Sequence, residues 1–323
     1  MIESQFTTAD NNTGQNQRST GLVPVDERLT AKKGTKNQNS AGLDPAGMRL
    51  KSQIRANLTM TLKPIYTPQN CKPSFKLYWT LSLFWRDKPV PANFWLDDLK
   101  SLTEKDGVRI LEYRFKSEVT SQFLISSRPE ISPSGIIRSA KGRLQYLIRE
   151  QIPKAFKGNY SIKSIGSAKL EIAENYLNSQ LEHHQMADAN VQKRFKKYHI
   201  DNLNLDLKSP RYSAHGQFNY NLHIVYVNTE RWREIRDDLL TKSLDLIQRT
   251  ARKKEHLLSK ARLLPDHIHI ILGCYVTESP MDIALGYMNN IAYGYGMKPV
   301  FQNSFFVGTL GEYDLGAIRQ ALP

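Results

Sequence analysis

The sequence contains little cysteine and no long apolar run. Only Cys71 and Cys274 occur among its 323 residues, far apart and without a Cys-x-x-Cys pair. Two isolated cysteines leave no cysteine-based zinc site and are typical of a reducing compartment. No apolar run reaches transmembrane length, and the N-terminus has no signal-peptide core. We therefore expect a soluble, cytoplasmic protein without a membrane partner.

Acidic residues are scarce relative to basic ones. Lys and Arg number 45 against 31 Asp and Glu, which gives a formal net charge of +14 and an isoelectric point near 9.6. Such an excess favours polyanionic partners, because each neutralised phosphate releases bound counterions. A basic protein with no nucleic-acid role is the alternative. Hydrophobic residues make up 40% of the chain, which is enough for at least one core.

The first 70 residues lack hydrophobic periodicity. Stretches such as "TTADNNTGQNQRST" and "AKKGTKNQNSAGLDPAG" are rich in Asn, Gln, Thr, Gly and Lys. This composition cannot bury enough apolar surface to offset the entropy that is lost on ordering. We expect residues 1–70 to form a disordered, mildly basic tail.

A regular pattern of strands and helices follows the tail. The run "FKLYWTLSLFW" is typical of a strand, and "SPSGIIRSAKGRLQYLIREQ" is typical of a helix with a Ser-Pro start. In this part of the chain the pattern predicts strands at 75–85, 108–116, 119–126 and 159–166, and helices at 91–105, 132–151 and 167–184.

The same order then starts again, which indicates an internal repeat. "ISP" matches "ESP" 147 residues later, and "IKSIG" matches "VGTLG" 145 residues later. The second copy predicts strands at 218–228, 256–264, 266–274 and 303–311, helices at 230–254 and 279–296, and a helix that begins after 311.

The repeat predicts an α+β fold of two tandem ferredoxin-like (RRM-like) domains. We place the first domain at 71–184 and the second at 218–323, and we expect residues 185–217 to be a polar, irregular linker. That linker is long enough for the domains to dock side by side as a pseudo-dimer. We expect their antiparallel sheets to meet as one continuous platform.

The two copies differ at their polar positions. His267 and His269 align with Thr and Gln in the first copy, where "TSQ" (120–122) stands in place of "HIH". The helix with Tyr176 and Gln180 belongs to the first copy. In the second copy Ala321 aligns with Tyr176, and the position aligned with Gln180 falls beyond the last residue. Each copy therefore lacks what the other keeps.

These spacings permit a metal-assisted reaction on a phosphodiester. Alternate residues of a strand share a face, and residues four apart on a helix share a face. Two imidazoles and an amide oxygen can hold a divalent ion with open positions for a phosphate. A tyrosine hydroxyl beside that phosphate can attack it and form a phosphotyrosine. Taken alone, a histidine pair on a strand or a Tyr and Gln on a helix is more often structural. A site is favoured because each copy lacks the feature that the other copy keeps.

Four stretches resemble the single-tyrosine HUH transposases, the insertion-sequence 200/605 and REP-associated families. "PDHIHIIL" resembles the family's His-hydrophobic-His motif, and "IIRSAKGRLQYLI" is similar to the basic helix that follows it. "SIGSAKLEIAENYLNSQ" resembles the closing strand, turn and helix that carry the tyrosine and a glutamine ligand. "FFVGTLGEYDLGAIRQ" is similar to the same element without its tyrosine.

The resemblance implies a site shared by the two copies. His267 and His269 would bind Mg²⁺ or Mn²⁺ together with Gln180, and Tyr176 would be the nucleophile. His184, four residues beyond Gln180, could replace or supplement that ligand. The chain would then be a fused pseudo-dimer with one composite active site, and two fused chains could also meet as a homodimer.

The resemblance also implies a substrate, which is single-stranded DNA at the hairpin-flanked ends of a mobile element. The reaction would cleave and rejoin this DNA through a 5′-phosphotyrosine. A hairpin-binding protein without cleavage and a nickase of the replication-initiator or relaxase kind are the alternatives. A prokaryotic protein of this kind would associate with the nucleoid.

Three groups of residues complete the expectations. Asp266 is expected to cap or orient rather than to ligate, and His223 is either structural or directed at the site or at DNA. Because Arg143 points away from its neighbours at helical spacing, it is alternatively a solvated side chain. The basic helix and its extension are expected to contact DNA through Arg138, Lys141, Arg143, Arg149, Lys154 and Lys157.

Overall fold

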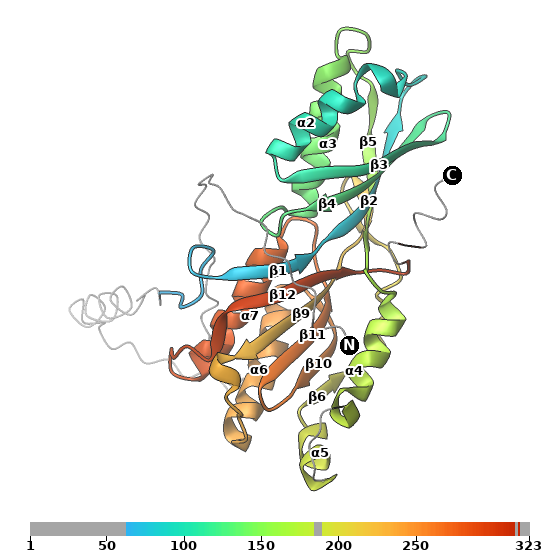
Figure 1. Ribbon diagram of the computed structural model, residues 1–323. Coiled ribbons are helices and arrows are strands. Elements are labelled where there is room, and N and C mark those ends of the chain that lie inside the picture. The colour runs from blue at the N-terminus through green and yellow to red at the C-terminus, as the bar shows by residue number, and fades with distance from the viewer. Residues whose placement is uncertain (1–62, 184–188, 314–315, 317–323) are drawn as a thin grey trace, which may run out of the picture.

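Two six-stranded sheets make up the fold. The computed structural model describes residues 63–183, 189–313 and 316, and the two sheets follow one another along the long axis of the molecule (Figure 1). The first sheet has the strand order β3-β4-β2-β5-β8-β7, and the second has the order β1-β12-β9-β11-β10-β6. The predicted α+β class is confirmed.

The first sheet and its helices follow the predicted order of elements. β2 alternates buried and half-buried residues because its apolar side chains occupy every second position, which matches the pleat of a strand. Ser132 caps α3 by accepting a hydrogen bond from the Gly135 amide at 3.2 Å, and Pro133 takes the first helical position. The elements are β2 (Tyr78–Trp85), η1 (Ala92–Phe94), α2 (Leu96–Lys105), β3 (Val108–Ser117), β4 (Thr120–Ser127), α3 (Pro133–Ile148), β5 (Phe156–Ile165), β7 (Arg211–Ser213) and β8 (Gly216–Asn219).

The second sheet has α6 and α7 on one face and α4 on the other (Figure 1). Ser279 caps α7 as Ser132 caps α3, by accepting from the Asp282 amide at 3.1 Å. None of the described helices is long and apolar enough to span a bilayer. The elements are β1 (Lys72–Lys76), α4 (Leu170–His183), α5 (Ala189–Lys196), β6 (His199–Asp201), β9 (Asn221–Asn228), η2 (Thr229–Arg231), α6 (Asp237–Lys253), β10 (Leu257–Leu263), β11 (His267–Gly273), α7 (Pro280–Gly294) and β12 (Phe301–Leu310).

Strand register confirms the alignment of the two copies. In the first sheet Ser82 of β2 pairs with Gln122 of β4. In the second sheet Val225 of β9 pairs with His269 of β11. The neighbouring rungs keep the same correspondence along both strand pairs. The "HIH" of β11 and the "TSQ" of β4 therefore occupy equivalent positions in the two sheets.

The two halves of the chain exchange strands. β1 continues through Leu77 into β2 but pairs in parallel with β12 of the second sheet. β8 continues through Tyr220 into β9 but pairs in parallel with β5 of the first sheet. The core of each sheet is antiparallel, and the exchanged strand adds one parallel pair to each. Neither half is closed without a strand from the other.

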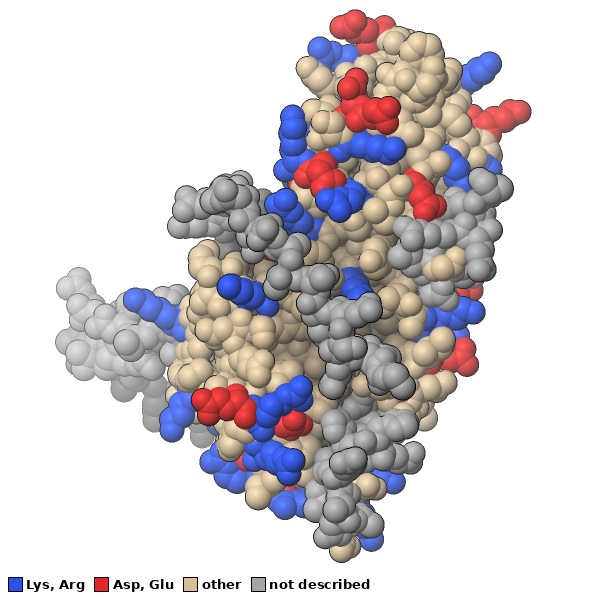
Figure 2. Space-filling view, in the orientation of Figure 1, with Lys and Arg blue, Asp and Glu red and all other residues tan. Residues whose placement is uncertain are grey.

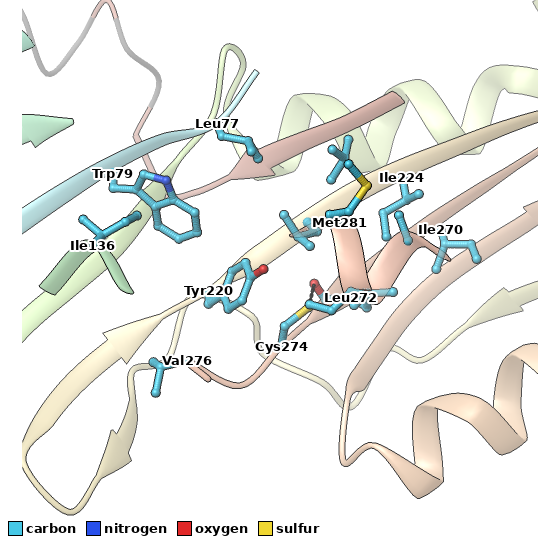
Figure 3. Packing of buried hydrophobic residues seen from close by; sticks show 14 of the residues in the cluster. Leu77, Trp79, Ile136, Tyr220, Ile224, Ile270, Leu272, Cys274, Val276 and Met281 are labelled. Carbon is cyan, nitrogen blue, oxygen red and sulfur yellow. Dashed lines mark hydrogen bonds between the residues drawn. The ribbon is translucent and has the colours of Figure 1, made fainter. Parts of the chain in front are cut away.

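A reciprocal pair of hydroxyl groups joins the sheets where β5 and β12 end. Ser164 donates to the carbonyl of Leu310 at 2.6 Å, and Thr309 donates to the carbonyl of Ile165 at 2.6 Å. Ser164 and Thr309 are both buried and occupy equivalent positions of the repeat. A single core extends across this junction, where the rings of Trp79 and Tyr220 meet edge to face at 5.2 Å (Figure 3).

The segment expected to be an irregular linker contains regular structure. Residues 189–217 hold α5, β6, β7 and the start of β8, and the short strands join both sheets. The sequence pattern missed β6 and β7 because strands of three residues give no detectable periodicity. Residues 72–76, expected in the first domain, pair with the second sheet instead.

The end of the expected tail is ordered as well. Residues 1–62 lie outside the described residues, but Tyr66 is fully buried against the second half. Its hydroxyl donates to the carbonyl of Phe301 at 3.1 Å and accepts from the Phe301 amide at 2.6 Å. The side chain of Asn289 pairs with both backbone groups of Tyr66. The expectation of disorder was wrong for this residue because one buried aromatic side chain and four hydrogen bonds offset the polar composition around it.

Tyr66 should therefore contribute to global stability. We expect Tyr66→Ala to lower the free energy of unfolding by about 3–5 kcal/mol, because it leaves a cavity and unpaired polar groups. Tyr66→Phe keeps the ring and should cost about 1–2 kcal/mol for the lost hydroxyl. Urea unfolding monitored by circular dichroism measures both, and equal stability of Tyr66→Ala and the unmodified chain would contradict the packing described.

Candidate active site

Two histidines share one face of β11 in the middle of the second sheet. Ile268 and Ile270 point to the opposite face and are buried in the core. His267 and His269 are each 6% exposed, and their ring centroids are 4.9 Å apart. The alternation along the strand thus places both imidazoles side by side on the face that α6 and α7 do not cover, as the motif predicted.

His267 is oriented by the carboxylate that precedes it. Its Nδ1 lies 2.7 Å from Oδ1 of Asp266, and Oδ2 of Asp266 lies 3.2 Å from the guanidinium of Arg231. The hydrogen bond with His267 and the weaker contribution of Arg231 hold the pKa of Asp266 well below its ordinary value, against the effect of burial. Asp266 is therefore anionic, and it orients His267 as expected.

His269 is oriented by a third histidine. Its Nδ1 lies 3.0 Å from Nε2 of His223, and the two rings are stacked with centroids 5.3 Å apart. Burial lowers the pKa of His223 to about 4, so that ring is neutral at pH 7. A neutral His223 can accept at Nε2 the proton that His269 carries on Nδ1. The sequence left the role of His223 open. The pairing of β9 with β11, which places His223 beside His269, is the feature that identifies its role.

The donor set fits a divalent metal ion. Because Nδ1 of both His267 and His269 is engaged by a neighbour, each would ligate through Nε2. A metal-bound histidine almost always has such a partner on its other nitrogen. Among the described residues no three His, Cys, Asp or Glu side chains form a metal cluster.

Helix α4 of the first half lies on the face of the second sheet that carries the histidines. Leu177 is fully buried beneath it. Arg262 of β10 donates to the Leu177 carbonyl at 3.3 Å and to Oδ1 of Asn178 at 2.9 Å. Lys260 donates to the same Asn178 oxygen at 3.3 Å. Two basic side chains of the second half therefore hold the helix of the first half.

Asp201 of β6 balances these buried cations. Its Oδ1 lies 2.6 Å from Arg262 and 2.9 Å from Lys260. Burial opposes ionisation, but the hydrogen bonds from both cations hold the pKa of Asp201 below its ordinary value. Arg262 also pairs in register with His269 on the neighbouring strand. The network that holds α4 thus lies directly beside the histidine pair.

Tyr176 lies close to the histidines. Its side chain is 41% exposed, and its ring centroid is 6.4 Å from that of His269, in an edge-to-face arrangement. The structure therefore brings together the tyrosine of one copy and the histidines of the other. Gln180 follows one turn later on α4, but its side chain lies outside those described, and His184 lies outside the described residues.

The equivalent place in the first sheet contains no histidine. Gln122 stands in the position of His269, and its Oε1 accepts a hydrogen bond from Arg114 at 2.8 Å. Thr120 stands in the position of His267. Neutral amide and hydroxyl groups replace both imidazoles, so this face of the first sheet lacks the imidazole ligands that the second sheet has.

Several of the residues expected to contact DNA are engaged within the protein. Arg143 forms an ion pair with Asp106 at 3.0 Å, and Lys141 donates to backbone carbonyls at the start of β5. Arg149 lies over the exposed ring of Tyr146, 4.1 Å from its centroid. Acidic and basic side chains are interspersed over the first half on the face shown (Figure 2). The other expected contacts are exposed: Arg138, Lys154 and Lys157.

The docking of α4 depends on Arg262. We expect Arg262→Met to lower the free energy of unfolding by about 2 kcal/mol, since it removes charge-assisted hydrogen bonds to α4 and to Asp201. Hydrogen exchange should then accelerate in α4 and stay unchanged in α3, which the network does not touch. Arg262→Lys keeps the charge but not the fork of donors and should give an intermediate rate. If Arg262→Met changes the exchange rates of α4 and α3 equally, Arg262 does not have this role.

Comparisons with known proteins find a matching family model and weakly similar solved structures. Residues 216–320 match the model of the IS200-like transposases. A transposase candidate from Deinococcus radiodurans R1 is 17% identical over 36% of this chain and 95% of its own, with a TM-score of 0.28. A REP-associated tyrosine transposase, solved with a REP hairpin, is 17% identical over 35% of this chain and 67% of its own, with a TM-score of 0.24. No curated protein matches the sequence. Residues 216–320, which hold the histidine pair, are thus similar to the IS200-like transposases.

Proposed function

We propose that this protein cleaves and rejoins single-stranded DNA with Tyr176 as the nucleophile. The observation that carries the proposal is the contact of Tyr176 with His269, at a ring distance of 6.4 Å. The two residues come from different copies of the repeat, and each is absent from the copy that keeps the other. A protein that only binds DNA has no need to keep these complementary halves together.

The reaction is a transfer of one phosphodiester bond. The oxygen of Tyr176 attacks phosphorus, the tyrosyl O–P bond forms, and the P–O3′ bond breaks. The attacking hydroxyl loses its proton and the departing strand gains one as its 3′-OH. The bond energy stays in the 5′-phosphotyrosine, so the 3′-OH of a second strand can reverse the step without ATP.

Mg²⁺ or Mn²⁺, held by His267, His269 and Gln180, would supply Lewis-acid polarisation of the phosphate. The role of the protein is to fix the two rings. Asp266 and His223 engage the Nδ1 atoms, so each ring would ligate through Nε2.

The DNA is proposed to be a hairpin-flanked single strand. The net charge of +14 supports a polyanionic partner, and the REP-associated relative was solved with a hairpin. We propose phosphate contacts from Arg138, Arg149, Lys154 and Lys157. Lys141 and Arg143 would first have to leave their partners within the protein, and their part in binding is correspondingly smaller.

Removal of the nucleophile tests the reaction. We expect Tyr176→Phe to form no covalent adduct with a labelled single strand in the presence of Mn²⁺, while its affinity for that strand stays within about twofold. Tyr212→Phe is the matched control, because Tyr212 is 70% exposed and lies on β7, at the far edge of the first sheet. Denaturing gel electrophoresis separates the adduct from free DNA. A covalent species with Tyr176→Phe would show that another residue is the nucleophile.

A mixing experiment tests whether the composite site lies within one chain. We expect a mixture of Tyr176→Phe and His267→Ala chains to form no adduct, because each chain then holds one defective site and α4 is fixed to its own second sheet. Recovery of adduct in the mixture would show that two fused chains share their sites, and that the homodimer is the active form.

A further inference from the structure

The loop between β9 and α6 has an unusual backbone. In η2, Glu230 and Arg231 both have positive φ, at 53° and 55°. Side chains with a Cβ disfavour this region, and two such residues in succession persist only where other contacts hold them. Glu255, which also has positive φ, follows the C-cap residue of α6, where a left-handed residue commonly ends a helix. Met297 lies beyond the C-terminus of α7, next to Gly296, which also has positive φ. The pair in η2 has no such explanation.

The unusual backbone delivers one side chain to the histidine pair. Arg231 reaches Oδ2 of Asp266 at 3.2 Å, while Oδ1 of the same carboxylate holds His267 at 2.7 Å. The base of the loop is fixed to the same segment, because the Asn228 amide donates to the Asp266 carbonyl at 2.8 Å and the Asn228 side chain donates to the Pro265 carbonyl. Both oxygens of the carboxylate are therefore engaged.

We propose that Arg231 is a positioning residue of the metal site, which fixes Asp266 and through it the ring of His267. The inference rests on the proposed function and adds a residue to it. An aspartate held only at Oδ1 can rotate about its last side-chain bond, and His267 can rotate with it. When Arg231 holds Oδ2, the carboxylate has one orientation, and Nε2 of His267 stays directed at the ion.

A direct contact with DNA is the competing role. The Arg231 side chain is 56% exposed, so a phosphate of the substrate could reach it. The two roles differ when no DNA is present. A positioning residue changes the affinity of the protein for the metal alone, whereas a phosphate contact changes only the affinity for DNA.

The test is the binding of Mn²⁺ to the full metal-free chain without DNA, followed by electron paramagnetic resonance. Arg231→Asn is the decisive variant, because asparagine tolerates the left-handed backbone and removes the guanidinium. We expect its dissociation constant for Mn²⁺ to rise about three- to tenfold, less than the 10–100-fold typical when the direct partner of a ligand is lost. The dissociation constant of Arg231→Lys for Mn²⁺ should lie between those of Arg231→Asn and the unmodified chain.

Arg233→Met is the matched control, since Arg233 is exposed in the same loop and its loss changes the charge equally. Its Mn²⁺ affinity should not change. If Arg231→Asn binds Mn²⁺ normally, Arg231 does not position the site, and weaker binding of a single strand would then assign it to DNA. If the unmodified chain and His267→Ala bind Mn²⁺ equally, the proposed metal site itself is wrong, and the inference falls with it.

Discussion

The docking of α4 on the second sheet is the interaction on which the site depends. The tyrosine belongs to one half of the chain and the histidines to the other, so their distance is set by how the helix is held. Arg262 and Lys260 hold it through Asn178, and Asp201 neutralises the two cations in a buried place. A buried cation pair without that carboxylate would be costly, because water could not solvate the charges. A strand from the segment between the halves therefore completes the site.

The exchange of strands makes this docking permanent. β1 and β8 each close the sheet of the opposite half, and Ser164 and Thr309 each bond a carbonyl across the junction. The helix begins only a few residues after β5 ends there, at an isolated bridge between Lys169 and Gly311. Separating the halves would expose a shared core and break these pairs together, and so the position of α4 follows from the fold.

The sequence predicted the repeat, the class of fold and the proximity of Tyr176 to the histidine pair. These predictions depend on periodicity and on an alignment of the chain with itself. It could not predict the exchange of strands, since the residue pattern of a strand does not specify which sheet the strand joins. β6 was missed because three residues give no period, and Tyr66 because a single anchor does not change local composition. His223 stayed ambiguous because its role depends on the register between β9 and β11, which only the structure supplies.

A fusion of two copies, which the proposed function assumes, would also explain how the two halves came to differ. In a symmetric homodimer a substitution changes both copies at once, so the loss of a histidine or of the tyrosine removes every site. In a fused chain each half can change separately, and one complete site survives as long as the losses fall on opposite halves. The Arg114–Gln122 pair at the position equivalent to His269 shows this freedom, because it satisfies a polar position with side chains that suit packing rather than ligation. On the proposed function, selection on stability alone could then shape the first sheet, while the second sheet would stay constrained by the geometry that two imidazoles and a tyrosine require.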